Sequence, residues 1–276
     1  MKEHETDHQT VIVDSPIMST EEIAQQVLKA DPKTNAYMPL SAGVESTATL
    51  LYAVKDPEIF PWCVHWYEPR YGQFADAMAF YSRKQAEYFK LPYGNDTSLL
   101  SGIGHTRESP IIINGMSAFM QCVIGSPGKF KFKWFMVGGN AEDDMRMRLQ
   151  MREYRKIMVN YLSDCLDSSG VHLDAIREVP EIRNPLDFMT KAELLSLIMR
   201  HDPKLYEMIW SCPFPKGKLV KQNKIAGYIP CGECYKCGEF KAAHQLAKDA
   251  KFRYQEGKEY YTRFYEAEKK MGKDNR

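Results

Sequence analysis

The sequence predicts an α/β protein with a parallel sheet, followed by a small metal-binding region near the C-terminus. Apolar segments of strand length alternate with segments of helical period, an order typical of parallel βαβ units. Four of the seven cysteines fall within one short C-terminal stretch. A length of 276 residues favours one or two domains. We expect a polar segment and a helix over residues 1–33, the main domain over residues 34–200, and a metal-binding helical region over residues 201–276.

The expected strands are short and apolar. The first covers residues 36–40, although Pro39 weakens its strand character. The second covers residues 62–67, and the third covers residues 111–113. In the fourth, residues 131–137, side chains alternate and then become apolar, which suits a buried strand. This strand leads directly into Gly138-Gly139-Asn140.

The expected helices alternate with these strands. A capping box at residues 19–22 begins a helix at the N-terminus. Residues 47–54 follow a glycine-containing turn and form the start of the next helix. The helix over residues 74–89 has apolar side chains near helical spacing at Phe74, Met78, Tyr81 and Ala86. Further helices are expected over residues 145–162 and 191–199.

Composition and charge exclude several classes of protein. The 37 basic and 36 acidic residues give a formal net charge of +1, so the whole chain offers no electrostatic reason to bind a polyanion. Its apolar runs are far too short to span a bilayer, and residues 1–14 lack the apolar stretch of a signal peptide. An odd number of cysteines without an export signal argues against a disulfide framework. We therefore expect a soluble, cytoplasmic protein.

The turn between the first strand and the next helix is Ser41-Ala42-Gly43-Val44-Glu45-Ser46-Thr47. Small residues at such a position let several backbone N–H groups point at one spot, where the helix N-terminus adds about half a positive charge. Its three hydroxyl groups add further donors. The turn therefore suits a phosphate or a pyrophosphate, and the alternative is an ordinary turn before a helix. It is neither a Walker loop nor a dinucleotide-binding turn, because their glycine and lysine patterns are missing.

The clustered cysteines are Cys212, Cys231, Cys234 and Cys237. The last three lie three residues apart, and short Cys-x-x-Cys turns bring two sulfur atoms to one ion. Four thiolates without histidine favour a closed structural zinc site over a catalytic one. An iron–sulfur cluster and a redox-active cysteine pair are the alternatives. We interpret Cys63, which stands alone in the second strand, as a core residue without a catalytic role.

The turn resembles the Ser-Gly-Gly-x-Asp-Ser loop of PP-loop ATP pyrophosphatases, with Ala42 in place of a glycine and Glu45 in place of an aspartate. Together with the cysteines, it is similar to the 7-cyano-7-deazaguanine synthase family. Further segments carry this resemblance: Tyr71-Gly72-Gln73, Gly138-Gly139-Asn140-Ala141-Glu142-Asp143, Asn184-Pro185-Leu186, Thr190-Lys191-Ala192-Glu193 and Trp210-Ser211-Cys212. The family's Tyr-Pro-Asp-Cys-Arg segment is not evident in residues 144–152, and the spacing between Cys212 and Cys231 is longer than expected.

This resemblance implies the fold of adenine-nucleotide α-hydrolase-like (HUP) proteins: a five-stranded parallel sheet with helices on both faces, and a small C-terminal zinc-binding helical appendage. It also implies an ATP-dependent ligase. In the family, ATP adenylates 7-carboxy-7-deazaguanine, ammonia displaces AMP to give an amide, and a second adenylation leads to 7-cyano-7-deazaguanine. The implied cofactors are ATP, Mg²⁺ and Zn²⁺, and the implied partners are the small substrate and ammonia, without nucleic acid or membrane. The oligomeric state, with a homodimer as one option, is left open.

The resemblance also assigns roles to residues. The nucleotide would be held by Ser41, Ala42, Gly43, Val44, Glu45, Ser46 and Thr47, and by Gly138, Gly139 and Asn140. The implied catalytic residues are Ser46, Glu45, Lys191 and Asp143. Lys191 would bring a positive charge to a phosphate or acyl oxygen, and Glu45 would contact magnesium or a hydroxyl group. Asp143 would bind the ribose or magnesium, and a helix N-cap is the alternative role.

Two other functions fit the same motifs. The first is a sulfur-handling PP-loop protein, either a sulfonucleotide reductase or a tRNA thiolase, in which thiols would turn over. The second is a relative that adenylates a macromolecule, with the charged tail over residues 241–276 as a docking arm. The substitutions at Ala42 and Glu45 keep this second alternative open.

Overall fold

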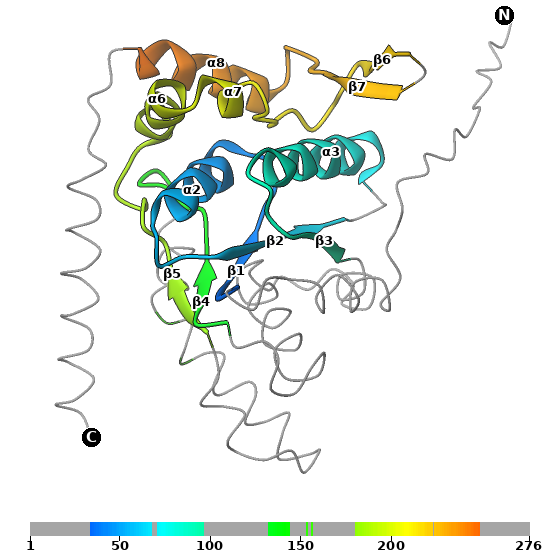
Figure 1. Ribbon diagram of the computed structural model, residues 1–276. Helices are drawn as coiled ribbons and strands as arrows, with labels where there is room; N and C mark the ends of the chain where they lie inside the picture. Colours follow the sequence, from blue (N-terminus) through cyan, green and yellow to red (C-terminus); the bar gives the residue numbers. More distant parts are fainter. Residues whose placement is uncertain are drawn as a thin grey trace, which may run out of the picture.

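Five parallel strands form the central sheet of the structure, a computed structural model that describes residues 34–67, 71–96, 132–143, 153, 156, 180–222 and 224–248 (Figure 1). The strands are β1 (Ala36–Pro39), β2 (Pro61–Trp66), β3 (Tyr93–Asp96), β4 (Trp134–Met136) and β5 (Glu181–Arg183). Their order is β3-β2-β1-β4-β5, and all neighbouring strands pair in parallel. The α/β class and the five-stranded parallel sheet predicted from the sequence are confirmed.

The middle of this sheet is buried on both faces. Successive side chains of a strand point to opposite faces, and both Tyr37 and Met38 of β1 are at most 1% exposed. Such two-sided burial is usual for parallel strands. The ring of Tyr37 also meets the ring of Trp62 edge-on, with 6.1 Å between their centroids. Trp62, which is 2% exposed, is therefore part of the core.

Two helices follow β1 and β2 and lie on the same side of the sheet (Figure 1). They are α2 (Val44–Lys55) and α3 (Gln73–Tyr88). The connections through both helices lead away from β1 in the same direction, so right-handed crossovers place the helices on one face. The predicted strand over residues 111–113 and the N-terminal helix lie outside the described residues. So does most of the predicted helix over residues 145–162.

Three helices form a further layer above α2 and α3 (Figure 1). They are α6 (Lys191–His201), α7 (Pro203–Tyr206) and α8 (Tyr235–Ala247). α6 begins at a capping box, in which the Thr190 hydroxyl accepts from the Glu193 amide and the Glu193 carboxylate accepts from the Thr190 amide. α6 contacts both α2 and α8. Ala243 and Ala247 of α8 are consequently part of the same apolar core as the helices below.

An antiparallel hairpin, β6 (Gly217–Lys221) and β7 (Lys224–Ile229), lies between Cys212 and Cys231. It accounts for the long spacing between these two cysteines. The hairpin packs on α3, where the Tyr81 hydroxyl accepts a hydrogen bond from the Tyr228 amide over 3.1 Å. Neither the hairpin nor strands β3 and β5 were predicted. None of the helices in the described ranges has both the length and the apolar character needed to cross a membrane.

The order of the strands also fixes where a ligand can bind. The chain proceeds from β1 through β2 to β3 on one side of the sheet, and from β4 to β5 on the other. Between β1 and β4 the direction of winding reverses. In open parallel sheets, ligands bind outside the carboxyl ends of the strands at such a switch point. The segments that leave β1 and β4 there are residues 40–43 and 137–140, which the sequence had singled out.

Candidate active site and metal centre

The turn after β1 is built largely from the backbone. Ala42 has a φ of 61° and is fully buried, a left-handed conformation that glycine adopts with less strain. Its carbonyl accepts a hydrogen bond from the Trp210 amide over 2.8 Å, which ties the turn to the C-terminal region. Gly43 follows as the N-cap of α2 and offers no side chain to its first turn. The amides at the start of α2 therefore have no side-chain cap, as an anion-binding turn requires.

The three hydroxyls of the turn have different surroundings. The Oγ atoms of Ser41 and Ser46 lie 3.1 Å apart, and the Ser46 hydroxyl also donates to the Gly43 carbonyl. Thr47 is fully buried, and its hydroxyl accepts from the Gln85 side chain of α3 over 2.9 Å. Thr47 therefore fastens α2 to α3. The structure brings Ser41 and Ser46 together, and it turns Thr47 into the core.

The segment after β4 packs directly against this turn. A Cβ atom at Gly138 would lie 2.7 Å from both the Glu45 carbonyl carbon and the Ser46 nitrogen, closer than real Cβ contacts. The backbones can approach only because residue 138 is glycine. Gly139 is buried next to it, and Asn140 donates from its side-chain amide to Glu45 Oε1 over 2.9 Å. The two segments predicted to hold the nucleotide thus lie side by side.

Asp143 stabilises the turn that follows. One oxygen of its carboxylate accepts from the Asn140 amide over 2.7 Å, and the Asn140 side-chain oxygen accepts from the Glu142 amide. The Glu142 carboxylate in turn accepts from the Lys191 amide at the start of α6. Asp143 is not among the residues that line the pocket described below. Its roles in ribose or magnesium binding and as a helix N-cap both stay predictions.

Lys191 lies between two carboxylates. Its Nζ is 3.0 Å from Glu45 Oε1 and 2.5 Å from Glu239 Oε1. Burial disfavours the charged ammonium group, but the hydrogen bonds and charges of both glutamates outweigh burial and raise the pKa of Lys191. Burial likewise acts against the charge on Glu239, whereas Lys191 and Lys236 lower the pKa of Glu239 below its usual value. Lys191 and Glu239 are therefore both charged near neutral pH.

A pocket of about 170 Å³ lies over the turn. Five residues predicted for the site line it: Ser41, Gly43, Val44, Glu45 and Lys191. Two apolar residues of α3 complete one part of the wall, Phe74 and Met78. The C-terminal region supplies the rest: Trp210, Ser211, Lys236, Glu239 and Phe240. The pocket thus combines an apolar wall with two lysines and two glutamates.

The sequence did not predict this C-terminal wall. Ser211 belongs to a segment that carried the resemblance, but only its neighbour Cys212 was given a role. Lys236 and Glu239 have the i, i+3 spacing of neighbours on a helix, and their side chains are 3.0 Å apart. A helix beginning at the last cysteines would have been the signal, because its first turns share a face with the metal site.

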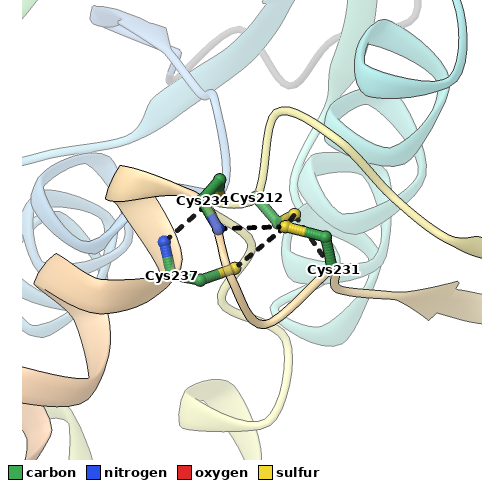
Figure 2. A group of neighbouring side chains, drawn as sticks. All are labelled: Cys212, Cys231, Cys234 and Cys237. Atoms are coloured by element: carbon green, nitrogen blue, oxygen red, sulfur yellow. Dashed lines mark hydrogen bonds between the residues drawn. The ribbon is translucent and has the colours of Figure 1, made fainter.

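The four cysteine side chains converge, as Figure 2 shows. Their sulfur atoms all lie within 4.8 Å of one another. Cys231 Sγ lies 3.5 Å from Cys212 Sγ and 3.8 Å from Cys237 Sγ. Backbone amides point at three of the sulfurs: those of residues 231, 234 and 237 donate to Cys212, Cys231 and Cys234, respectively.

These distances agree with a single tetrahedral ion. Zinc–thiolate bonds of about 2.3 Å place the sulfurs of a tetrahedral site about 3.8 Å apart. The thiolates around a four-iron cube stand farther apart, roughly 6 Å. Backbone amides of Glu233 and Cys234 lower the pKa of Cys231 to about 6, whereas burial raises the pKa of Cys237 to about 12. A bound cation would hold thiols in such a cluster as thiolates.

Cys63 and His65 of β2 have no part in either site. Cys63 is fully buried, and burial raises the pKa of its thiol to about 12. Burial also lowers the pKa of His65 to about 4, so its ring is neutral and Nδ1 donates to the Leu40 carbonyl over 3.0 Å. The interpretation of Cys63 as a core residue agrees with this burial.

Comparisons with known proteins give a likeness of structure but not of sequence. No family model matches the sequence, and no curated protein matches it either. Among solved structures, the chain is similar to the U34-tRNA thiolase NcsA from Methanococcus maripaludis with its [4Fe-4S] cluster, at 15% identity and a TM-score of 0.38. The match covers 90% of this chain and 78% of that chain. A likeness of this degree does not bear on activity, and the cluster and the tRNA belong to that protein.

Proposed function

We propose that the protein uses ATP to adenylate a substrate, cleaving the bond between the α and β phosphates. The observation that carries this proposal is the pocket, in which the glycine-containing turn and Lys191 face one space at the switch point of a parallel sheet. The first-turn amides of α2 and the hydroxyl of Ser41 would bind the pyrophosphate portion. The Lys191 ammonium group has three N–H donors. Two of them bond to the two carboxylates, and the third would donate to an oxygen of the phosphate chain.

In this reaction a nucleophilic oxygen of the substrate attacks the α-phosphorus, the bond to the bridging oxygen of the β phosphate breaks, and pyrophosphate leaves. The protein contributes by positioning the reactants and by stabilising the charge that develops on pyrophosphate. Glu45 is the residue that would hold a magnesium ion, which neutralises phosphate charge when bound. Its carboxylate lines the pocket and is fixed by Asn140 and Lys191.

For the substrate we propose 7-carboxy-7-deazaguanine, on the strength of the motifs that resemble the 7-cyano-7-deazaguanine synthase family. A flat bicyclic ring suits the apolar wall formed by Phe74, Met78, Trp210 and Phe240. Adenylation of its carboxylate makes AMP the leaving group, which ammonia then displaces at the acyl carbon to form the amide. A second ATP activates the amide oxygen, and loss of AMP and a proton leaves the nitrile.

A sulfur-transfer reaction is the second candidate, because the cysteine cluster adjoins the pocket. Ser211 lines the pocket and Cys212 is its immediate neighbour. Against this candidate, no cysteine is among the lining residues of the pocket in the described part of the chain. We therefore propose that the four cysteines bind one structural zinc ion.

Exchange of radiolabelled pyrophosphate into ATP tests the proposal. With magnesium and 7-carboxy-7-deazaguanine, we expect label to appear in ATP, and we expect Lys191→Met to slow this exchange at least tenfold, on the order of the loss of one charged contact to a transition state. Exchange that requires tRNA instead would replace the ligase by the sulfur-transfer candidate. Exchange that requires a protein would favour the macromolecular alternative, and no exchange with any of them would refute ATP activation.

A further inference from the structure

The two segments that supply the cysteines also supply the C-terminal wall of the pocket. Trp210 and Ser211 line the pocket immediately before Cys212. Lys236 lies between Cys234 and Cys237, and Glu239 and Phe240 lie two and three residues after Cys237. The same two chain segments therefore contribute to both the metal site and the pocket.

Helix α8 begins inside the metal site. Cys234 is its N-cap, and the Cys234 sulfur accepts from the Cys237 amide over 3.4 Å. Farther along, α8 is held by packing: Ala243 and Ala247 are buried, and His244 Nδ1 lies 2.8 Å from the Tyr206 hydroxyl. The first turn of α8, in contrast, has only one buried side chain, that of Cys237. The position of this first turn therefore depends on the cysteine cluster.

Glu239 connects the first turn of α8 to the turn at residues 41–47. Its Oε1 atom accepts from Lys191 Nζ over 2.5 Å, and its Oε2 atom accepts from Lys236 over 3.0 Å. Lys191 Nζ reaches Glu45 Oε1 at the start of α2. A chain of four charged side chains thus joins the first turns of α8 to the anion-binding turn.

We propose that Glu239 is a positioning residue for Lys191, and that metal at the four cysteines sets the place of Glu239. The proposal rests on the proposed function in one respect, namely that the pocket binds a nucleotide. Metal bound to Cys234 and Cys237 fixes the first turn of α8, so Glu239 holds Lys191 toward the turn. Without the ion Lys191 loses one of its two anchors. Metal binding and nucleotide binding then favour each other, and this coupling must be reciprocal.

Zinc release to a colorimetric chelator measures the coupling without any activity assay. The probe is α,β-methylene-ATP with magnesium, because the enzyme cannot split it. We expect this nucleotide to slow zinc release from the wild-type protein about fivefold or more. In Glu239→Gln the nucleotide should change the release rate less than twofold, because a neutral side chain holds the Lys191 ammonium weakly.

Glu233→Gln is the matched control. Glu233 lies between Cys231 and Cys234, is largely exposed and pairs only with Lys216 among the salt bridges of the described residues. It is not among the residues that line the pocket. Removing its charge should leave the effect of the nucleotide on zinc release as in the wild type. The proposal is overturned if the nucleotide binds but does not slow zinc release, or if Glu239→Gln binds the nucleotide more tightly than the wild type.

Hydrogen exchange tests the structural link without a nucleotide. Removing zinc should speed amide exchange in residues 41–47, where the Thr47 amide bonds to the Gly43 carbonyl, but not in β2. If removing zinc speeds exchange in the turn but calorimetry shows that the nucleotide does not bind, the structural link between the metal site and the turn would stand and the nucleotide-binding function would be refuted. Exchange that quickens only around residues 231–240 would overturn the link itself.

Discussion

In the turn at residues 41–47 the groups proposed to bind a ligand are mainly backbone amides, whereas those of the cysteine site are four side-chain sulfur atoms. We therefore expect the turn to tolerate substitutions that keep the path of the backbone. The cysteine site should have no such tolerance, because each of the four sulfur atoms would supply one ligand to the same ion. The two regions should consequently respond in different ways to mutation. In the cysteine site any change of side chain should matter, whereas in the turn only changes that obstruct the backbone should matter.

The largest effect is expected at the cysteines. Cys234→Ser should release the metal and lower the free energy of unfolding by several kcal/mol, because structural zinc contributes its binding energy directly to folding. Metal content by mass spectrometry and the melting temperature measure this effect. Cys63→Ala, which removes a buried thiol far from the cluster in sequence, should keep the full metal content. A Cys234→Ser protein with full metal and a normal melting temperature would contradict the prediction.

The next effect is expected at Gly138. In Gly138→Ala the new methyl group would press on the backbone of Glu45 and Ser46, which cannot rotate away. We expect a loss of about 1–3 kcal/mol in the free energy of unfolding, with weaker ATP binding and unchanged metal content. Gly217→Ala in the hairpin is the control, because no atom lies within 4 Å of a Cβ there. Equal stability of both variants in urea would show that the close approach at Gly138 is not required.

Adjacent hydroxyls in the turn should separate binding from stability. Ser46→Ala should weaken ATP binding about three- to tenfold, since losing one hydrogen bond of about 1 kcal/mol loosens Ser41, which lines the pocket. Thr47→Ala should instead lower the unfolding free energy by about 1 kcal/mol and leave ATP binding unchanged, because Thr47 bonds to Gln85 in the core. Calorimetry with ATP and thermal melting of both variants provide the measurements. The opposite pattern would place Thr47 in the site.

The same contrast explains how far the sequence could be interpreted. The four cysteines were found from their spacing, because the ligands are side chains of a single residue type. The turn was found from small residues between a strand and a helix, and Gly138 from the resemblance of its segment to a family motif. Glu239 was missed, because its role depends on how α8 packs over Lys191, which no local pattern records. Strands β3 and β5 were missed because Tyr93–Asp96 and Glu181–Arg183 lack an apolar run, and their pairing with neighbours overrides their weak strand propensity.

The smallest effect, and the sharpest test of a backbone-built turn, is expected from Ala42→Gly. Ala42 is strained in a left-handed conformation that glycine adopts freely. Glycine, however, loses more conformational entropy on folding than alanine does. The balance should raise the free energy of unfolding by about 0.5–1 kcal/mol, with ATP binding equal or slightly tighter. Lys90→Gly is a matched control, because Lys90 has a similar φ of 56° after α3, outside the pocket. The Lys90→Gly variant should be stabilised to a similar degree without any change in ATP binding. If Ala42→Gly is destabilising while Lys90→Gly is stabilising, the free energy gained by packing the buried methyl group of Ala42 exceeds the free energy of its backbone strain.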